Sequence, residues 1–225
     1  MIPNEVIFIV QILITLGAVL AASRLGEYAL VSVMCLFVII ANMFVTQTIL
    51  LFGATATSTD AFMVSLSLAV LLLQKQYGEV QARRAILISF IGLFLFTLLS
   101  IIHLWYVPAP TDIMHAAFVL LLTPVPRILI ASALAYGSAQ LVNIWLFRLL
   151  HKAMGNRWLM LQTYGAVTCS QILDTLLFTI LGLYGVVAHL TSVAFVSMVI
   201  KMVTVLVSAP LFKLAQSLRF IFPKS

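Results

Sequence analysis

The sequence predicts an all-α, polytopic helical membrane protein, and three observations lead to this fold class. Of its 225 residues, 64% are hydrophobic and 8% are charged, and the mean hydropathy is +1.21. Several stretches stay apolar for about 20 residues, the length that crosses a bilayer core of about 30 Å as a helix. These runs are continuously apolar, whereas the strands of a membrane β-barrel alternate in polarity. Because no polar stretch is long enough for a soluble domain, residues 1–225 are predicted to form one membrane domain.

About seven apolar runs are predicted to span the membrane, and polar or glycine-containing segments separate them. A shorter apolar segment, 113–122, lies between two proline-containing stretches. At about 10 residues it is too short to cross the bilayer, so we expect it to be interfacial or re-entrant. The predicted spans are residues 6–22, 29–51, 61–77, 85–106, 127–149, 164–187 and 190–212.

The positions of lysine and arginine predict the orientation of these spans. All of them except Arg127 and Lys201 lie in the first, third and fifth loops or in the C-terminal segment. Loops rich in Lys and Arg stay in the cytoplasm. We therefore expect a multi-pass protein of the cell (inner) membrane with its N-terminus outside and its C-terminus in the cytoplasm.

Two charged residues lie within the predicted spans, where an ionisable side chain is costly unless it is paired or hydrated. Asp174 is the eleventh residue of the sixth span, and Lys201 is the twelfth of the seventh. At 1.5 Å per residue both lie near the middle of the bilayer. Adjacent antiparallel helices are therefore predicted to bring them together. Such a pair marks a functional site or, alternatively, only holds two helices in register.

Polar and aromatic side chains at helical spacing lie at a similar depth in three spans. A single buried amide usually links two helices. Several amides around an Asp–Lys pair instead favour a cavity that binds a solute. These residues are Asn42, Thr46 and Gln47 in the second span, Tyr136, Gln140, Asn143 and Phe147 in the fifth, and Gln171, Asp174 and Phe178 in the sixth.

The chemistry of this set indicates a flat, hydrogen-bonding solute. A carboxylate accepts two neighbouring hydrogen bonds, and amides donate and accept side by side. This set of hydrogen-bond donors and acceptors suits a guanine-like base, which has an N–H/NH₂ edge and a carbonyl. Aromatic side chains can stack on the faces of such a base. A cationic amine or an ion fits the same residues, so the side chains alone leave the solute open.

Several longer segments resemble those of the queuosine precursor transporters, a vitamin-uptake-like family. That family is related in fold to the substrate-binding components of energy-coupling factor transporters. The resemblance extends over about residues 1–213 and depends on the order and spacing of the segments. The segments are "ANMFV", "LFGATAT", "YGEVQARR", "PRILIASALAYGSAQLVNIWLF", "SQILDTLLF" and "IKMVTVLVSAPLF".

The resemblance implies a six-helix core, preceded by an extra N-terminal helix, and a function in queuosine salvage for tRNA modification. The implied substrate is a 7-deazaguanine base, such as 7-cyano- or 7-aminomethyl-7-deazaguanine, or queuine. Asp174 would then accept hydrogen bonds from the N1–H/NH₂ edge, and Lys201 would keep Asp174 ionised or meet the substrate carbonyl. The substrate-binding residues that we expect are Asn42, Arg127, Tyr136, Gln140, Asn143, Gln171, Asp174, Phe178 and Lys201.

The chain departs from the family pattern at several polar positions. Many members carry an acidic pair at the positions of Leu71 and Lys75, and a basic residue at that of Gln47. Many have Asp where Asn143 stands and Arg where Gln162 stands. These departures leave the transport class intact and the particular solute open.

Other classes of protein fit the sequence less well. No phosphate-binding loop is present, so the chain cannot hydrolyse ATP by itself. We expect a carrier that acts alone. The alternative is a substrate-binding component for another planar, vitamin-like solute that needs an energising ATPase module. A second copy of the chain is a further candidate partner, whereas a nucleic acid is not, because the basic residues form no patch.

We also expect no enzymatic activity, no metal and no cofactor. All four histidines lie at predicted span ends or in loops, and Asp60, Asp112 and Asp174 are predicted to lie at different depths. Cys35 and Cys169 lie within apolar runs and are expected to be free thiols.

Overall fold

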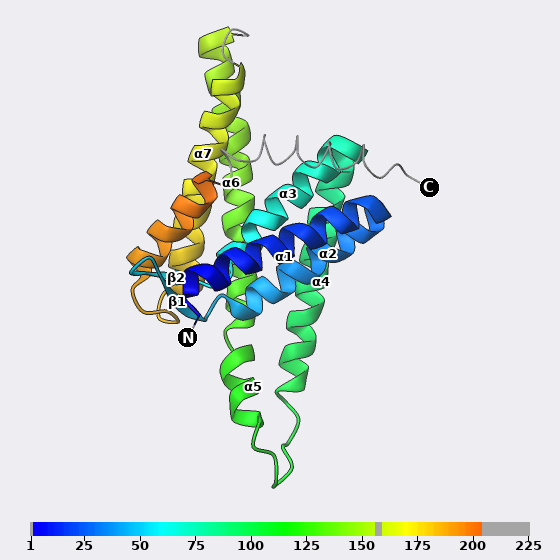
Figure 1. The fold of residues 1–225 in the computed structure, drawn as a ribbon, viewed down its shortest axis with the longest axis vertical. Helices are drawn as coiled ribbons and strands as arrows, with labels where there is room; N and C mark the ends of the chain where they lie inside the picture. The colour runs from blue at the N-terminus through cyan, green and yellow to red at the C-terminus, as the bar shows by residue number, and fades with distance from the viewer. Residues whose placement is uncertain (1, 156–158, 204–225) are drawn as a thin grey trace.

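Long apolar helices make up nearly all of the structure, as Figure 1 shows. The structure is a computed structural model, and it describes residues 2–155 and 159–203. The elements in chain order are α1 (Asn4–Leu25), α2 (Glu27–Phe44), β1 (Thr48–Leu51), β2 (Ala54–Thr57), α3 (Asp60–Tyr77), α4 (Glu79–His103), α5 (His115–Leu122), α6 (Val125–Met154), α7 (Leu159–Phe178), the π-helical turn η2 (Thr179–Leu183) and the helix Leu190–Val203.

Five helical stretches in the described part of the chain are long and apolar enough to cross a membrane. They belong to α1, α2, α4, the combined segment of α5 and α6, and the end of α7 with η2. Two further apolar helices, Asp60–Gln74 and Leu190–Val203, are shorter. The predicted class, an all-α polytopic membrane protein, is confirmed. The number of spans and their orientation remain predictions.

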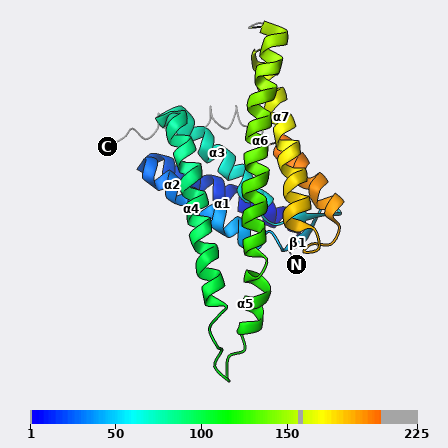
Figure 2. The ribbon, with the colours of Figure 1, turned by 180° about the vertical axis from the view of Figure 1, so that it is seen from behind.

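The helices form two groups that meet along α4 and α6. Figures 1 and 2 both show α4 and α6 running side by side, with α5 continuing the direction of α6. Helix α7 packs along α6. Helices α1, α2 and α3 cross the long helices obliquely and share an apolar core, in which Leu30, Leu72 and Leu73 are almost fully buried.

The second predicted span is wrong at its outer end. It was expected to continue to residue 51, but α2 ends at Phe44 and the following residues form the antiparallel hairpin β1–β2. Phe52 and Gly53 both have positive φ angles, 51° and 78°. This conformation suits the two-residue turns that match the twist of paired strands, and glycine adopts it without steric cost. Thr46 and Gln47 therefore lie in a turn outside the helix.

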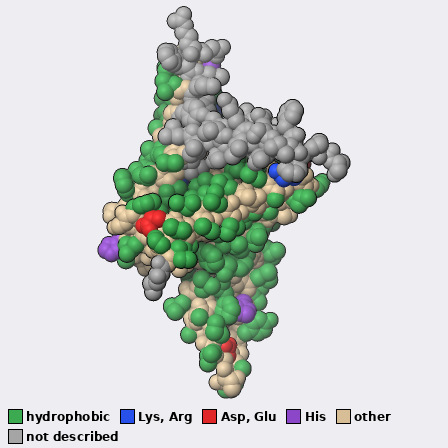
Figure 3. Space-filling view, in the orientation of Figure 1, with side chains coloured by type: hydrophobic (Ala, Val, Ile, Leu, Met, Phe, Trp, Pro, Cys, Tyr) green, Lys and Arg blue, Asp and Glu red, His purple; other side chains and the backbone are tan. Residues whose placement is uncertain are grey.

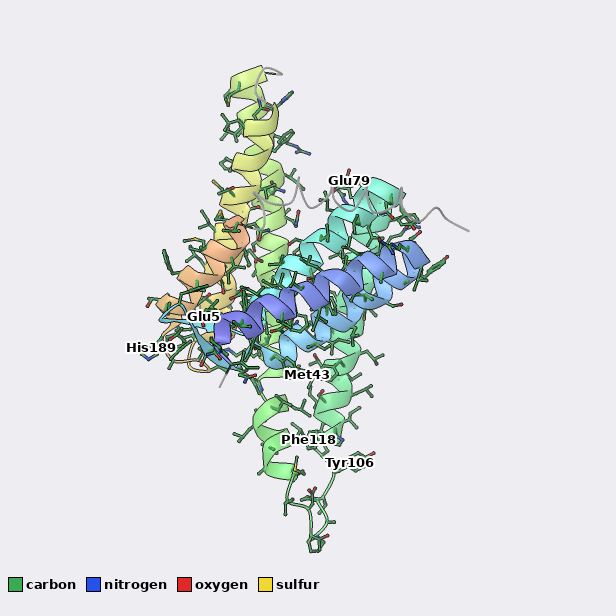
Figure 4. All side chains as sticks on the ribbon, in the orientation of Figure 1. Glu5, Met43, Glu79, Tyr106, Phe118 and His189 are labelled. Carbon is green, nitrogen blue, oxygen red and sulfur yellow. The ribbon has the colours of Figure 1, made fainter. Side chains whose placement is uncertain are left out.

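Side chains from two distant segments hold the hairpin in place. The Asn4 amide donates to the Leu50 carbonyl at 2.9 Å, and the Phe52 N–H donates to a carboxylate oxygen of Glu5 at 2.9 Å. On the other side, Ser192 Oγ accepts from the Thr55 N–H at 2.9 Å and donates to the Thr55 carbonyl at 3.1 Å. The hairpin thus joins the start of α1 to the start of the Leu190–Val203 helix. Figure 4 labels Glu5 and His189 on this side of the molecule.

The remaining predicted spans keep their places, with changed ends. The short apolar segment 113–122 forms α5, and only the sequence Thr123–Pro124 separates it from α6. Pro124 and Pro126 have no backbone N–H, so the helical hydrogen bonds that they would donate at this point are missing. The sixth span begins earlier than expected, at Leu159, and ends in η2. For the seventh, residues 204–212 lie outside the described residues.

Many large hydrophobic side chains of the described residues are exposed, which suits helices that face lipid. In Figure 3, green hydrophobic side chains are spread over the described part of this face, with few charged or histidine side chains among them. In Figure 4, Glu79 lies at one end of α4, and Tyr106 lies beyond the opposite end. At the Glu79 end, Gly78 has a φ of 94° and its N–H donates to the Gln74 carbonyl, which lets the chain reverse between α3 and α4.

Candidate functional site

An ion pair inside the helical region forms the centre of the candidate site. Lys201 Nζ donates to Asp174 Oδ2 at 2.6 Å. The two side chains are only 12% and 17% exposed, respectively. The predicted pairing of these two residues is confirmed. Because α7 carries Asp174 and the Leu190–Val203 helix carries Lys201, the pair joins two helices that follow each other in the chain.

A second carboxylate, that of Asp60, belongs to the same charged region. Asp60 is the first residue of α3 and is 4% exposed. Ser197 Oγ donates to Asp60 Oδ2 at 2.8 Å, and the charge of Lys201 also acts on Asp60. The sequence predicted different depths for Asp60 and Asp174, and their depths remain a prediction. Both carboxylates nevertheless contact the same helix one turn apart, Asp60 at Ser197 and Asp174 at Lys201.

The spacing of Ser197 and Lys201 is the signal that sequence analysis missed. Residues four apart lie on the same helix face. A polar residue one turn from an intramembrane lysine therefore points to a second partner on the same side. The partner is Asp60, which comes from the segment after the hairpin. By contrast, Asp112 lies in the exposed loop after α4, where its carboxylate accepts from the Met114 N–H at 2.7 Å.

Hydroxyl groups complete the surroundings of Asp60. Thr57 Oγ1 donates to Asp60 Oδ2 at 3.3 Å, and Thr59 Oγ1 donates to Thr57 Oγ1 at 3.2 Å. Both threonines are at most 5% exposed, and Ser197 is 9% exposed. A small apolar cluster of Phe8, Leu51, Ala56 and Ala61 lies against Val196 and Ile200, next to this network. Asp60 is thus held by oxygen atoms within a largely apolar environment.

The predicted polar stripe of α6 consists of four half-buried side chains, Tyr136, Gln140, Asn143 and Phe147. Asp174 and Tyr136 are close enough to interact electrostatically. Within the described residues, the side-chain amides of Gln140 and Asn143 have no hydrogen-bond partner, and neither has that of Gln171. These amides are therefore available to a solute or to water.

Asn42 extends this stripe from α2. Its Oδ1 accepts from Ser132 Oγ at 3.3 Å, and its Nδ2 donates to the Val38 carbonyl one turn back, at 2.8 Å. Ser132 lies one turn before Tyr136, so Asn42 meets the same face of α6. Asn42 links two helices, and the expected contact with a solute remains a prediction.

Two other predicted site residues have structural contacts. Arg127 is exposed, and its Nε donates to the Leu181 carbonyl of η2 at 2.8 Å. Phe178 packs against the apolar cluster of Val45, Ile128 and Leu183. The structure does not bring Arg127 to the ion pair, so its expected contact with a solute also remains a prediction.

Gln162, one of the departures from the family pattern, joins the ends of α6 and α7. Its side chain is fully buried, and its amide donates to the Gly155 carbonyl at 2.7 Å. Its carbonyl oxygen lies 3.1 Å from His151 Nδ1, and the His151 ring stacks on Phe147. Gln162 thus stabilises a helix connection.

Of the other departures, Gln47 is exposed in the turn before β1, and Leu71 is half-buried in α3.

The helices also form an open groove between α4 and α6, away from the ion pair. Its lining is almost entirely apolar and includes Phe90, Phe94, Leu129 and Leu134. None of the predicted site residues lines it. An apolar lining of this kind suits lipid acyl chains better than a polar solute.

The fold and the buried charges define a multi-pass membrane protein with ionisable groups inside its helical region, a feature typical of transporters. The family described as "putative vitamin uptake transporter" matches residues 60–215, and the chain belongs to this family. The matched residues include all three members of the charged cluster, Asp60, Asp174 and Lys201.

One curated relative has a more specific name than the family description. A protein of Bacillus subtilis (strain 168) named "probable queuosine precursor transporter" is 29% identical over 147 residues. The aligned part covers 65% of this chain and 64% of the relative, so the chain spans slightly less than two thirds of the relative's length. No solved structure gives a significant match.

Proposed function

We propose that the protein carries a queuosine precursor into the cell across the cell (inner) membrane. The substrate is a 7-deazaguanine base, such as 7-cyano- or 7-aminomethyl-7-deazaguanine, or queuine. The observation that carries the proposal is the Lys201–Asp174 pair within the helices. Membership of the uptake family and the name of the Bacillus subtilis relative support it.

The order of donors and acceptors in this pair fits a guanine-like edge. Such an edge presents a carbonyl acceptor followed by two donors, the ring N–H and the amino group. An ammonium next to a carboxylate presents one donor followed by two acceptors. Lys201 then donates to the substrate carbonyl, and Asp174 accepts from the N–H and NH₂ groups. An adenine-like edge has a donor, its amino group, where a guanine-like edge has the carbonyl. That amino group would face the Lys201 ammonium.

The half-buried residues of α6 and α7 complete the binding site in this proposal. Gln140, Asn143 and Gln171 hydrogen-bond to the remaining ring atoms, and Tyr136 packs against the ring face. These three amides lack partners among the described residues, so a solute does not have to break an existing hydrogen bond. The protein acts as a carrier, with no catalytic step.

A complementation experiment tests the proposal. The full chain is expressed in bacteria that neither make nor import queuosine precursors, and each 7-deazaguanine base and queuine is supplied separately. Queuosine in tRNA is the readout. We expect at least one compound to restore it, and Asp174→Asn to abolish the restoration. Asp112→Asn makes the same chemical change at an exposed loop residue and serves as the control.

Two results would count against the proposal. The first is no restoration by any compound although the protein is present in the membrane. The second is full restoration by Asp174→Asn. If restoration appears only when an ATPase module copurifies with the chain, the protein is instead a substrate-binding component of an energised complex. The family description, which names vitamin uptake, keeps this second function open for another planar solute.

A further inference from the structure

Two largely buried carboxylates contact neighbouring turns of the helix that carries the Lys201 ammonium group. Ser197 and Lys201 lie one turn apart on their helix, about 6 Å along its axis. Ser197 bonds to Asp60, and Lys201 bonds to Asp174 while its charge also acts on Asp60. With both carboxyl groups ionised, this cluster carries a net charge of −1. A buried, uncompensated charge is unfavourable in an apolar environment, so a further positive charge stabilises the cluster.

The surroundings of Asp60 are those of a site for a small, hard cation. Its hydrogen-bond partners are the hydroxyl groups of Thr57 and Ser197, and Thr59 bonds to Thr57 in turn. Oxygen-only surroundings favour hard cations over transition metals. Ser58 lies between Thr57 and Thr59 in the same loop. Its Oγ is buried and has no hydrogen-bond partner in the part of the chain that the structure describes.

Few other charged groups act on Asp60 from the elements around it. The hairpin contributes threonines, and α1 contributes the apolar Phe8. Glu5 of α1 is bonded to the Phe52 N–H at the exposed turn of the hairpin. On the Leu190–Val203 helix the charged neighbour is Lys201, and through it Asp174 on α7. The charge balance at Asp60 therefore depends on Lys201 and on whatever cation binds there.

We propose that Asp60, with the hydroxyl groups of Thr57, Thr59 and Ser197, binds one monovalent cation, H⁺ or Na⁺, that is cotransported with the substrate. The inference rests on the proposed function, because it supplies the driving force for the same carrier. When the cation neutralises Asp60, the Lys201 ammonium compensates only the negative charge of Asp174. Asp174 then stays ionised and accepts both donors of the substrate, so the cation and the substrate favour each other's binding.

Uptake by the full chain in proteoliposomes tests this coupling. Vesicles receive either an inward Na⁺ gradient at equal pH or an inward H⁺ gradient in Na⁺-free choline buffer. One of the two gradients is expected to accelerate precursor uptake several-fold. The gradient that acts identifies the cation. If neither gradient changes wild-type uptake, the proposal is wrong.

Variants locate the cation at Asp60. Asp60→Asn is expected to remove the acceleration, and the exposed control Asp112→Asn is expected to keep it. Ser197→Ala leaves the carboxylate in place and should raise the cation concentration for half-maximal uptake by about tenfold. Its control is Ser32→Ala, at an exposed serine that bonds only within its own helix. If Asp60→Asn does not fold, the Ser197→Ala comparison decides, and an unchanged cation dependence in that variant contradicts the proposal.

A measurement without substrate separates this inference from the proposed function. The unfolding temperature of the purified protein is compared in NaCl and choline chloride at equal ionic strength, and again at decreasing pH. We expect Na⁺ or H⁺ to stabilise the wild type more than Asp60→Asn. Equal responses of the two proteins overturn the cation site. If cation stabilisation is present but no 7-deazaguanine binds, the proposed substrate is wrong and the cation site stands.

Discussion

Lys201 donates to Asp174 at 2.6 Å, and this contact connects the two helices that close the candidate site. One turn before Lys201 on the same helix, Ser197 donates to Asp60 at the start of α3. This helix thus connects two carboxylates from separate parts of the chain.

Removing one member of the ion pair is predicted to cost more stability than removing both. Asp174→Asn leaves the largely buried Lys201 ammonium without its carboxylate, and we expect a loss of about 3 kcal/mol in unfolding free energy. Adding Lys201→Met removes the unpaired charge and should restore part of this loss. Unfolding of the purified proteins in detergent measures both effects. Simple addition of the two single losses would show that the residues do not interact.

The binding site is predicted to discriminate between the edges of purine-like bases. 7-Deazaguanine should bind more tightly than 7-deazaadenine by about 1–3 kcal/mol, the usual size of a base-edge preference. The reason is that an adenine-like amino group would face the Lys201 ammonium. Calorimetry on the purified protein measures both affinities. Lys201→Met should reduce the difference, and equal affinities for the two bases in the wild type would contradict the proposed pose.

Ser192 is predicted to be important for the position of the hairpin. Ser192→Ala removes both hydrogen bonds to the Thr55 backbone and should destabilise the protein by about 1–3 kcal/mol. Ser32→Ala serves as the control, since Ser32 is bonded to the Tyr28 carbonyl in its own helix. Thermal unfolding gives the comparison. An equal, small effect of both substitutions would show that the Ser192 contact adds nothing to stability.

The turn of the hairpin is predicted to require glycine because of its backbone conformation alone. A Cβ atom at Gly53 would meet nothing within 4 Å, but the φ angle of 78° is unfavourable for other residues. We expect Gly53→Ala to destabilise the protein by about 1 kcal/mol. Gly137 on α6 also has open space for a Cβ atom, and there Ala should stabilise by about 0.5–1 kcal/mol. A lower unfolding temperature for Gly53→Ala together with a higher one for Gly137→Ala would support this explanation. Changes in the same direction would contradict it.

Most helices could be located from the sequence because a bilayer demands long, continuous apolar segments. Asp174 and Lys201 stood out as well, since charges within such segments are rare. The second predicted span extended through the hairpin because Thr48–Leu51 continues the apolar run and periodicity cannot separate a short apolar strand from a helix end. The two positive φ angles at Phe52 and Gly53 belong to the folded backbone, and composition alone did not reveal them.

The family resemblance also predicted the transporter family to which the chain belongs. The expected contacts of Asn42, Arg127 and Phe178 with a solute remain predictions. In the structure, these residues contact Ser132, the Leu181 carbonyl and an apolar cluster, respectively. An amide, a guanidinium or a ring can serve a helix contact or a ligand equally well, so residue type by itself does not decide between the two roles.

By itself the sequence determined that this protein lies in a membrane, which segments are helical, and that one carboxylate and one lysine lie among them. Only the tertiary structure decided that Asp60 and Asp174 contact neighbouring turns of the Leu190–Val203 helix. Helical periodicity describes one segment at a time, whereas this cluster depends on how the hairpin, α3, α7 and the Leu190–Val203 helix pack together. The charge balance of the site is therefore a property of the packed helices.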